Sequence, residues 1–321
     1  MSIEAVSQGT GGTGSTGGTG STDGPRDAAA GPRTIGWIGA GKMGGPMIRR
    51  LVEAGHRLVV SEPDAGNRAA AAAAGAETGF DVPALAARAG IVFSMIPNDT
   101  VLAAVVLGEA GLAARLAPGA ILVEMSTVSP AISRRVAAAL AERGIAYVRA
   151  PVSGSTVMAE AGTLSVLASG PRAAYDAVEP LLARLSARRF YVGEDEQARY
   201  LKLVLNTLVG GTASLVAEAL ALGRRGDIDI RDMMEVICQS AVASPLIGYK
   251  RALIESGDYT PAFTVAQMMK DFDIIIDTAR ADHVPMFVSA LVRQQYESAY
   301  RAAAERDFFV LCEESLAAAA E

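Results

Sequence analysis

The sequence predicts an α/β protein with two ordered parts: a doubly wound parallel sheet, followed by an all-α C-terminal domain. Short apolar runs alternate with helical stretches from residue 34 to about residue 193, as in parallel sheets that helices cover on both faces. Beyond residue 193 almost every segment shows helical periodicity. With 321 residues, 50% of them hydrophobic, the chain is long enough for two domains with cores of their own.

The composition argues against several classes of protein. The formal net charge is −6, which disfavours nucleic-acid binding because phosphate contacts need a basic surface. Cys238 and Cys312 are too few for a disulfide scaffold, and with the two histidines they show no metal-ligand spacing. We therefore expect no metal site. The N-terminus lacks the basic start and apolar run of a signal peptide, so we expect a cytoplasmic protein.

The first 33 residues differ from the rest. Residues 9–22 are only glycine, serine and threonine, and the hexapeptide at 11–16 recurs at 17–22. Such a stretch cannot bury apolar surface, so residues 1–33 are predicted to be a disordered tail. The sheet domain is then expected over residues 34–195 and the helical domain over residues 196–321.

The elements of the sheet domain follow in order. Short apolar runs predict strands at residues 34–38, 58–61, 91–96, 120–125 and 145–148, and weaker strand-like runs follow at 163–169 and 190–192. A helix is expected from about 43 to 54, where Gly55 is a good residue to end it. The alanine run at 69–74 is helical by propensity.

The helical domain begins with the most apolar stretch of the chain, residues 201–222. Its length suits a membrane span, but it contains Lys202, Asn206 and Glu218, and ionisable residues are costly in lipid. We expect instead a helix buried on all sides in a soluble protein, without a membrane partner. Further helices are expected from 232 onward and at 263–280, 285–301 and 307–319.

A glycine-rich turn follows the first strand and matches the pattern G-x-G-x-x-G. Its residues are Gly39, Ala40, Gly41, Lys42, Met43 and Gly44. A strand before the pattern and a helix after it are the context of a Rossmann-type dinucleotide-binding turn. The first glycine allows the tight turn, the second lets a pyrophosphate approach, and the third lets helix and strand pack closely. A glycine turn without a ligand is the alternative.

Glu62 ends the second strand, about 20 residues after the glycine turn, at the spacing of an acid that binds ribose. Its carboxylate can accept from both ribose hydroxyls and would repel a 2′-phosphate. Pro63 stands where an NADP enzyme would have arginine, and Arg68 is expected inside the next helix. The sequence therefore predicts NAD rather than NADP, with a solvated glutamate as the alternative. The expected cofactor-binding residues also include, at the end of the third strand, Met95, Ile96 and Pro97.

Four separated motifs resemble the β-hydroxyacid dehydrogenase family, over nearly all of residues 34–316. The family includes 3-hydroxyisobutyrate dehydrogenase, tartronate semialdehyde reductase and glyoxylate reductases. The motifs are the glycine turn with Ala54-Gly55-His56, Met125-Ser126-Thr127-Val128-Ser129-Pro130, Ala150-Pro151-Val152-Ser153-Gly154 with Ala161-Gly162-Thr163-Leu164, and Lys202-Leu203-Val204-Leu205-Asn206. Lys270-Asp271 is a further signature of the resemblance.

The resemblance implies a role for each motif. Thr127 would lie beside the nicotinamide ribose, and Lys270 would approach the cofactor from the helical domain. Lys202 would be the catalytic acid/base and Asn206 would orient the substrate, in a site between the two domains. The substrate carboxylate would be held by Ser153, Gly154 and Ser155. A homodimer or homotetramer is also implied.

Two positions depart from the family pattern. Arg149 stands where the family usually has aspartate, and Ser155 stands where it usually has a second glycine. Ser155 adds a side chain beside the expected carboxylate site, so the choice of hydroxyacid stays open. Arg149 is expected on the surface, and contact with a second anionic group of the substrate is the alternative.

Lys202 and Asn206 also suit the chemistry without the family. Oxidation of an alcohol needs a group that accepts the hydroxyl proton, and lysine can serve when burial lowers its pKa toward neutrality. Lys202 begins the most apolar helix, and Asn206 follows four residues later on the same helical face. From spacing alone, a lysine that points to water is an equal alternative.

These observations predict an NAD-dependent oxidoreductase that interconverts a short-chain β-hydroxyacid and its semialdehyde or keto form. An imine reductase-like NAD(P)H enzyme is one alternative, although that class usually lacks lysine at the position of Lys202. A non-catalytic dinucleotide-binding module is the other, and loss of this lysine would mark it. A 6-phosphogluconate dehydrogenase is disfavoured, because Leu205 replaces the histidine that precedes asparagine in that class.

Overall fold

The computed structural model describes residues 4–6 and 33–319 of the chain. It divides into two compact units, Met1–Lys202 and Leu203–Glu321. The division falls inside one long helix, α9 (Gln197–Arg225), a few residues after the boundary expected from the sequence.

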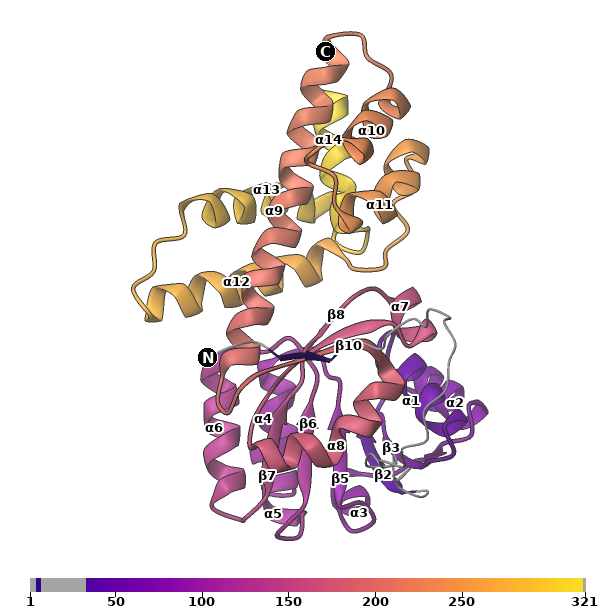
Figure 1. The fold of residues 1–321 in the computed structure, drawn as a ribbon, viewed down its shortest axis with the longest axis vertical. Coiled ribbons are helices and arrows are strands. Elements are labelled where there is room, and N and C mark those ends of the chain that lie inside the picture. The colour runs from indigo at the N-terminus through magenta and orange to yellow at the C-terminus, as the bar shows by residue number, and fades with distance from the viewer. Residues whose placement is uncertain (1–3, 7–32, 320–321) are drawn as a thin grey trace, which may run out of the picture. The chain divides into compact units, whose positions relative to one another are not determined.

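The first unit is built on a ten-stranded sheet in the order β1-β10-β9-β7-β6-β5-β2-β3-β4, with β8 paired to β9 (Figure 1). The strands from β7 to β4 are all parallel, whereas β9 meets β7 antiparallel. Strand order reverses at β2, which pairs with β3 on one side and β5 on the other. Ligands of doubly wound sheets bind outside the carboxyl ends of the strands at such a reversal. The predicted fold class is confirmed.

The strands that the sequence predicts are present, within one to four residues at their ends. The bounds are β1 Glu4–Val6, β2 Thr34–Ile38, β3 Arg57–Ser61, β4 Glu77–Thr78, β5 Ile91–Ser94, β6 Ile121–Glu124, β7 Ala146–Arg149, β8 Val152–Ser153, β9 Leu164–Ser169 and β10 Ser186–Gly193. Strands β1, β4 and β8 have only two or three residues each, too few for a hydrophobic pattern to reveal.

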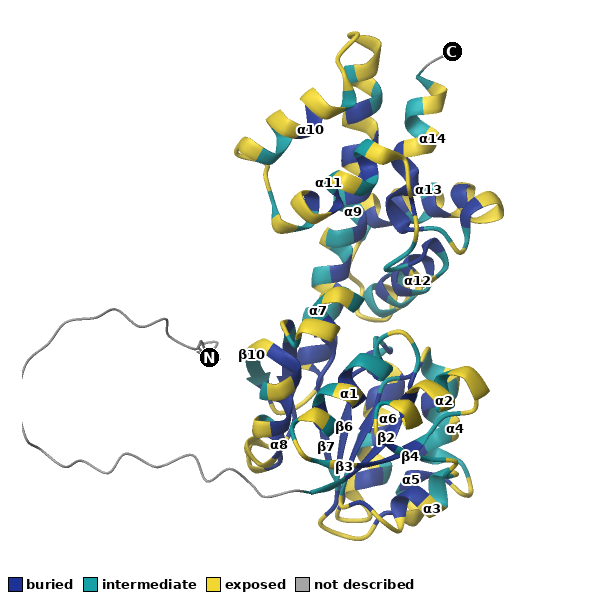
Figure 2. Cartoon of the chain, turned by 90° about the vertical axis from the view of Figure 1, so that its right-hand side faces the viewer, coloured by how far each residue is buried: buried dark blue, intermediate teal, exposed yellow. Residues whose placement is uncertain are grey.

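Helices cover both faces of the sheet, so its strands are largely buried (Figure 2). One face packs against α1 (Gly44–Glu53), α2 (Ala65–Ala73), α7 (Thr156–Ala161) and α8 (Arg172–Leu185). The other packs against α3 (Val82–Ala86), α4 (Asp99–Leu107), α5 (Leu112–Arg115) and α6 (Pro130–Ala141). Because apolar residues on both faces of the strands find partners, the strands read as continuous apolar runs in the sequence.

The ends of two helices are set by residues whose backbone or side chain favours a helix terminus. Gly55, just after α1, has φ +88°, a conformation that costs glycine little. Ser129 is the N-cap of α6: its Oγ accepts from the Ile132 N–H at 3.1 Å, and Pro130 occupies the first turn. The expectation that Gly55 ends the first helix is confirmed.

Residues 4–6 lie within the segment expected to be a disordered tail. They form β1, which pairs antiparallel with β10 from Glu4 opposite Tyr191 to Val6 opposite Arg189. The edge strand β10 offers backbone N–H and C=O groups for such pairing. The rest of the predicted tail, including the hexapeptide repeat, lies outside the described residues.

The second unit consists of helices. It begins within α9. The elements that follow are α10 (Ile230–Gln239), α11 (Pro245–Ser256), α12 (Val265–Ala281), α13 (Phe287–Ala303), a 3₁₀ turn η1 (Phe308–Val310) and α14 (Leu311–Ala318). In the described residues beyond 193, β pairing is limited to an isolated bridge between Thr264 and Asp307. The all-α prediction is confirmed, and α12 begins with a capping box of Thr264 and Gln267.

Helix α9 departs from the expectation that it is buried on all sides. One stripe, Ala213, Val216, Ala217 and Leu220, belongs to the core of the second unit. Another stripe is 53 to 76% exposed and comprises Val204, Leu208, Leu215 and Leu222. The length and hydropathy of α9 would suit a membrane span, and 44% of its most apolar stretch is buried within the protein. Hydropathy averages over both stripes, so it does not reveal that the unit covers only one.

A buried ion pair ties the end of the second unit to α11. Lys250 Nζ lies 2.5 Å from Asp307 Oδ2, and both side chains are buried. The Lys250 ammonium also lies 4.9 Å from the centre of the Phe308 ring. Asp307 accepts further hydrogen bonds from the N–H groups of Ala262 and Phe309. Such a pair is costly to break on one side only.

We therefore expect Lys250→Met to destabilise the second unit by about 3–5 kcal/mol, because Asp307 would keep a buried charge without its cation. Urea unfolding followed by circular dichroism measures this loss. Arg280→Met, which removes an exposed partner of Asp277, is the control and should cost far less. Equal losses in the two variants would contradict the interpretation.

Candidate functional site

At two of its three glycines, the turn between β2 and α1 leaves no room for a larger residue. Gly39 has φ +89°, and a Cβ there would lie 2.2 Å from the carbonyl oxygen of Met95. A Cβ on Gly44 would lie 2.0 Å from the carbonyl oxygen of Gly39. Gly41 differs, because the nearest atom to its Cβ would be Asn67 Nδ2 at 4.0 Å. The turn is therefore packed behind and open at Gly41.

The end of β5 lies directly behind this turn. The Met95 N–H donates to the carbonyl of Ile38 at 2.9 Å, and the Met95 carbonyl faces Gly39. Trp37 Nε1 donates to the Gly39 carbonyl at 2.8 Å. The structure thus brings Met95 and Ile96 to the predicted cofactor turn, and Pro97 follows them in the chain.

Glu62 reaches the glycine turn from the end of β3. Its Oε2 accepts from the Ala40 N–H at 2.6 Å, and its Oε1 accepts from the Asp64 N–H at 2.9 Å. Arg68 lies in α2, as expected, and its Nη1 donates back to the carbonyls of Glu62, at 3.0 Å, and Pro63. A carboxylate and a guanidinium therefore both stand at the end of β3, where the sequence places only the carboxylate.

The loop after β6 carries Thr127 to the same edge of the sheet. Its preceding residue, Ser126, accepts from the Ile96 N–H through Oγ at 2.8 Å. The Ser126 N–H donates to Glu124 Oε1 at 2.9 Å, and the Ser126 carbonyl accepts from Arg199 Nη1 at 2.7 Å. Hydrogen bonds thus join the segments at the ends of β2, β3, β5 and β6, which carry the predicted cofactor residues.

Lys202 and Asn206 lie on α9, four residues apart and so on one helical face. Lys202 is half-buried and Asn206 is buried. Within the second unit, Asn206 Nδ2 donates to Asp271 Oδ2, and Lys270 Nζ lies 2.9 Å from Asp271 Oδ1. The structure therefore groups Asn206, Lys270 and the buried Asp271.

The segment after β7 holds the three residues predicted to bind a carboxylate. Ser153 ends β8 opposite Ser165. Gly154 is exposed with φ +138°, and a Cβ there would lie 2.7 Å from Leu164 Cδ2. Ser155 is the residue before α7 and makes no side-chain cap to that helix. The backbone at Gly154 accordingly requires glycine.

Arg149 does not lie on the surface, contrary to the expectation. It is 5% exposed, and its Nη2 lies 2.6 Å from Glu196 Oε1. Its guanidinium lies 4.7 Å from the centre of the Tyr147 ring. The sequence did not reveal this pairing, because Glu196 lies 47 residues further on.

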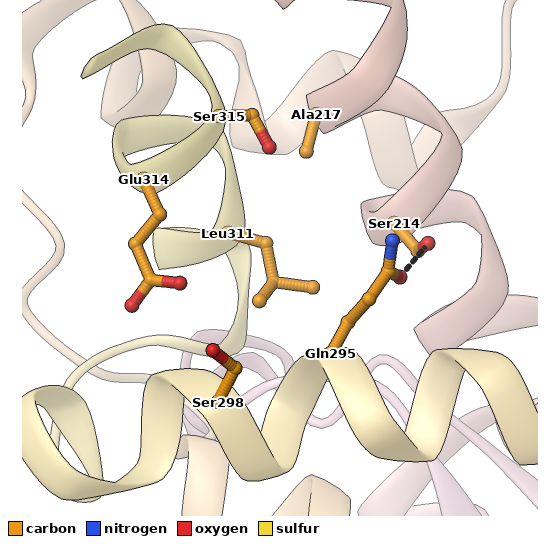
Figure 3. A pocket seen from close by; sticks show the side chains of 7 residues that line it. All are labelled: Ser214, Ala217, Gln295, Ser298, Leu311, Glu314 and Ser315. Atoms are coloured by element: carbon orange, nitrogen blue, oxygen red, sulfur yellow. Dashed lines mark hydrogen bonds between the residues drawn. The ribbon is translucent and has the colours of Figure 1, made fainter. Parts of the chain in front are cut away.

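The second unit contains a cavity of about 140 Å³ between α9, α13 and α14, and Figure 3 shows the side chains around it. The cavity is lined by Ser214, Ala217, Gln295, Ser298, Leu311, Glu314 and Ser315. Ser214 Oγ and Gln295 Oε1 are hydrogen-bonded across one wall. None of the predicted site residues lines this cavity. Among the described residues, no group of three histidine, cysteine or acidic side chains could hold a metal ion.

Comparison with known proteins agrees with this geometry. Residues 34–193 match a family model described as the NAD binding domain of 6-phosphogluconate dehydrogenase. Residues 197–311 match one described as NAD-binding of NADP-dependent 3-hydroxyisobutyrate dehydrogenase. The 2-(hydroxymethyl)glutarate dehydrogenase of Eubacterium barkeri is 33% identical over 264 residues, which cover 82% of this chain and 88% of the relative. The chain belongs to the β-hydroxyacid dehydrogenase family.

Two further relatives extend the match to this family. The 3-hydroxyisobutyrate dehydrogenase of Pseudomonas aeruginosa is 31% identical over 280 residues, covering 85% of this chain and 94% of the relative. The crystal structure of a 3-hydroxyisobutyrate dehydrogenase from Salmonella typhimurium has a TM-score of 0.79 and 25% identity, covering 88% and 99%. The resemblance predicted from the motifs is confirmed. The chain is thus an NAD(P)-dependent dehydrogenase that acts on CH–OH groups.

The glycine turn of this β-hydroxyacid dehydrogenase fits the dinucleotide that the family binds. The open face at Gly41 leaves the backbone accessible, and the first N–H groups of α1 favour a phosphate there. Glu62 fits an adenosine ribose, because the carboxylate oxygens have lone pairs beyond those that bind Ala40 and Asp64.

Sequence reasoning assigned no role to three charged residues that hold residues of this site, although it noted Asp271 as part of a motif. Glu124 and Arg199 hold Ser126, and Asp271 holds Asn206. Each is a charged residue within an apolar context and close to a motif: Glu124 precedes Met125, Arg199 precedes Lys202 by three residues, and Asp271 follows Lys270. Buried charges are paired or hydrogen-bonded, so these positions carried a usable signal.

A methyl group is expected to have different effects at the packed Gly44 and at the open Gly41. Gly44→Ala should lower stability by several kcal/mol, because its Cβ would meet the Gly39 carbonyl oxygen at a distance that forces the backbone to move. Gly41→Ala should leave the melting temperature unchanged and weaken NAD binding at least about tenfold, because its Cβ occupies the approach of a phosphate. Thermal unfolding and titration of NADH fluorescence separate the two, and similar effects in both variants would refute the assignment of the open face.

Proposed function

We propose that the chain interconverts a short-chain β-hydroxyacid and its semialdehyde or keto form, using NAD, with Lys202 as acid/base. The observation that carries the proposal is the pair of Lys202 and Asn206 on one face of α9, with Asn206 oriented by Asp271. An amine and an oriented amide one helical turn apart can contact one substrate oxygen between them.

In the oxidative direction, Lys202 Nζ accepts the proton of the substrate hydroxyl, and in the reductive direction it returns that proton. The bound nicotinamide supplies the hydride acceptor or donor. Asn206 orients the same oxygen, and its amide is held by a carboxylate, which fixes the direction of the hydrogen bonds that it offers. Ser153 and Gly154 receive the substrate carboxylate through a hydroxyl and backbone N–H groups.

The preference for NAD rests on Glu62. Its carboxylate is held at the end of β3 by two backbone N–H groups, so it cannot easily turn away from a 2′-phosphate. Arg68 stands beside it and donates to the carbonyls of Glu62 and Pro63. We infer that the Glu62 carboxylate repels the 2′-phosphate of NADP, and that Arg68 would attract this phosphate if Glu62 lost its charge.

The two alternatives are an imine reductase-like enzyme and a non-catalytic dinucleotide-binding module. Lys202 argues against both, because the first class resembles this one but usually lacks the lysine, and the second has no need of it. Asn206, one helical turn after Lys202, is held by Asp271, as expected of an amide that orients a substrate.

We also propose that the chain assembles into a homodimer or homotetramer. Exposed apolar patches often mark protein–protein contacts, and α9 exposes an apolar stripe of Val204, Leu208, Leu215 and Leu222. A second group of exposed apolar residues lies at the start of α13 and comprises Val284, Phe287, Val288 and Leu291. Burial of either surface against a copy of the chain would remove it from water.

The hydroxyacid proposal predicts NADH formation with one member of a panel of acids. The panel contains 3-hydroxyisobutyrate, 3-hydroxypropionate, glycerate, serine, threonate, 4-hydroxybutyrate and 2-(hydroxymethyl)glutarate. Lys202→Ala should lower kcat by about 10²–10⁴-fold, the usual contribution of a general base, while NADH still binds. Absorbance at 340 nm, recorded with NAD and with NADP, measures this.

Arg224→Ala is the matched control, since it removes an exposed cation from the far end of the same helix. It should keep wild-type turnover. Near wild-type turnover in Lys202→Ala would remove the lysine from the mechanism. Activity with cyclic imines and none with the acids would favour the imine reductase alternative.

The cofactor proposal predicts that Glu62→Gln shifts the preference toward NADP. Glutamine keeps an acceptor for Ala40 and removes the charge, so kcat/KM with NADP should rise about tenfold, the equivalent of about 1.4 kcal/mol. Glu53→Gln, which neutralises an exposed acid of α1, is the control. Adding Arg68→Gln to Glu62→Gln should abolish the gain, and a gain that survives this change would exclude Arg68 from NADP binding.

A further inference from the structure

Arg199 is a fully buried arginine, only 1% exposed, one helical turn before Lys202. Its guanidinium is surrounded by acceptors. Nη2 pairs with Glu124 Oε2 and donates to Tyr147 Oη at 3.0 Å. Nη1 donates to the Ser126 carbonyl at 2.7 Å. Although burial opposes its charged form, the Glu124 carboxylate raises the pKa of Arg199 above its ordinary value.

Glu124 links Arg199 to the loop after β6, at the edge of the sheet where the cofactor is expected. It is wholly buried at the end of β6, and its Oε1 accepts from the Ser126 N–H. Ser126 is therefore held through its N–H by Glu124 and through its carbonyl by Arg199. Its hydroxyl in turn accepts from the Ile96 N–H at 2.8 Å. Ile96, Thr127 and Lys202 each lie within three residues of a group in this network.

The pair is not needed merely to fill space. A buried ion pair often contributes no more stability than apolar residues of similar volume, because the two charges lose their hydration. A guanidinium with fixed donor directions does offer something that apolar residues lack, namely a defined geometry for several acceptors at once.

We propose that Arg199, held by Glu124, is a positioning residue of the reaction. It sets the first turn of α9 against the loop of Ser126, and so fixes Lys202 relative to Thr127. The inference rests on the proposed function of Lys202. Arg199 acts on the site through the protein groups that it binds.

The test compares Arg199→Lys with Arg189→Lys. Lysine keeps the charge but cannot donate to Glu124, Ser126 and Tyr147 in the directions of a guanidinium. Arg189 is the matched control, since it is 5% exposed, belongs to the same unit, and pairs with Glu179 and the Ser186 carbonyl. All assays are run on the full chain at a temperature where both variants are shown to be folded.

We expect Arg199→Lys to lower kcat at least about tenfold, since a misplacement of 1 Å can cost far more, with the KM for the hydroxyacid within about threefold of wild type. Glu124→Gln should give a similar loss, and the double variant should lose no more than either single variant, as for groups that act as one unit. Arg189→Lys should keep wild-type kcat.

A second readout does not depend on turnover. The chain has four lysines, Lys42, Lys202, Lys250 and Lys270, so acetylation of each by limiting acetic anhydride can be followed by mass spectrometry. We expect Arg199→Lys to change the acetylation rate of Lys202 relative to the other three, and Arg189→Lys to leave the ratios unchanged.

The outcomes separate this inference from the proposed function. A kcat and Lys202 acetylation rate in Arg199→Lys that match those of Arg189→Lys would overturn the positioning role, whatever the wild type does. If the wild type oxidises no acid of the panel, the proposed function fails. The acetylation ratios then decide the positioning role by themselves: a change at Lys202 supports it and an unchanged ratio refutes it.

Discussion

The first unit depends on a close approach of backbone to backbone at the glycine turn. Gly39 and Gly44 pack against the carbonyls of Met95 and Gly39 with no space for a side chain. This contact seats α1 on β2 and β5, and it turns the N-terminus of α1 toward the edge where the parallel strands end. The reversal of strand order at β2 leaves the same edge open to a ligand. Because the packing is dense behind the turn and open at Gly41, one short segment both closes the core and leaves its backbone accessible at the start of α1.

Buried charges then connect this edge of the sheet to α9, the helix of Lys202. Two arginine–glutamate pairs, Arg199 with Glu124 and Arg149 with Glu196, join the ends of β6 and β7 to the start of α9. Each charge is shielded from water, so its partner has to be in place for the fold to tolerate it. A dehydrogenase needs its proton acceptor held in a fixed relation to its cofactor, and a rigid junction between the sheet and the first turn of α9 suits that need.

The parts of the molecule that the sequence predicted correctly are those with local signals. The strands of the parallel sheet are continuous apolar runs, and Ser129-Pro130 and Gly55 mark helix ends through their own backbone chemistry. The parts that it missed depend on residues far apart in the chain. Arg149 was expected at the surface, and its partner Glu196 lies 47 residues away. The exposed stripe of α9 escaped notice because an apolar helix looks alike whether the second unit covers it on one side or on all sides.

The continuity of α9 bears most directly on the chemistry. Lys202 is the last residue of the first unit and Asn206 lies in the second, yet both belong to one unbroken helix. Their spacing is therefore set by the hydrogen bonds of that helix, which fix a rise of about 1.5 Å per residue, whatever the two units do. Arg199 anchors this helix in the sheet unit, and Asp271 orients Asn206 within the helical unit. The backbone of α9 thus fixes the separation of an amine and an amide whose supports belong to different cores.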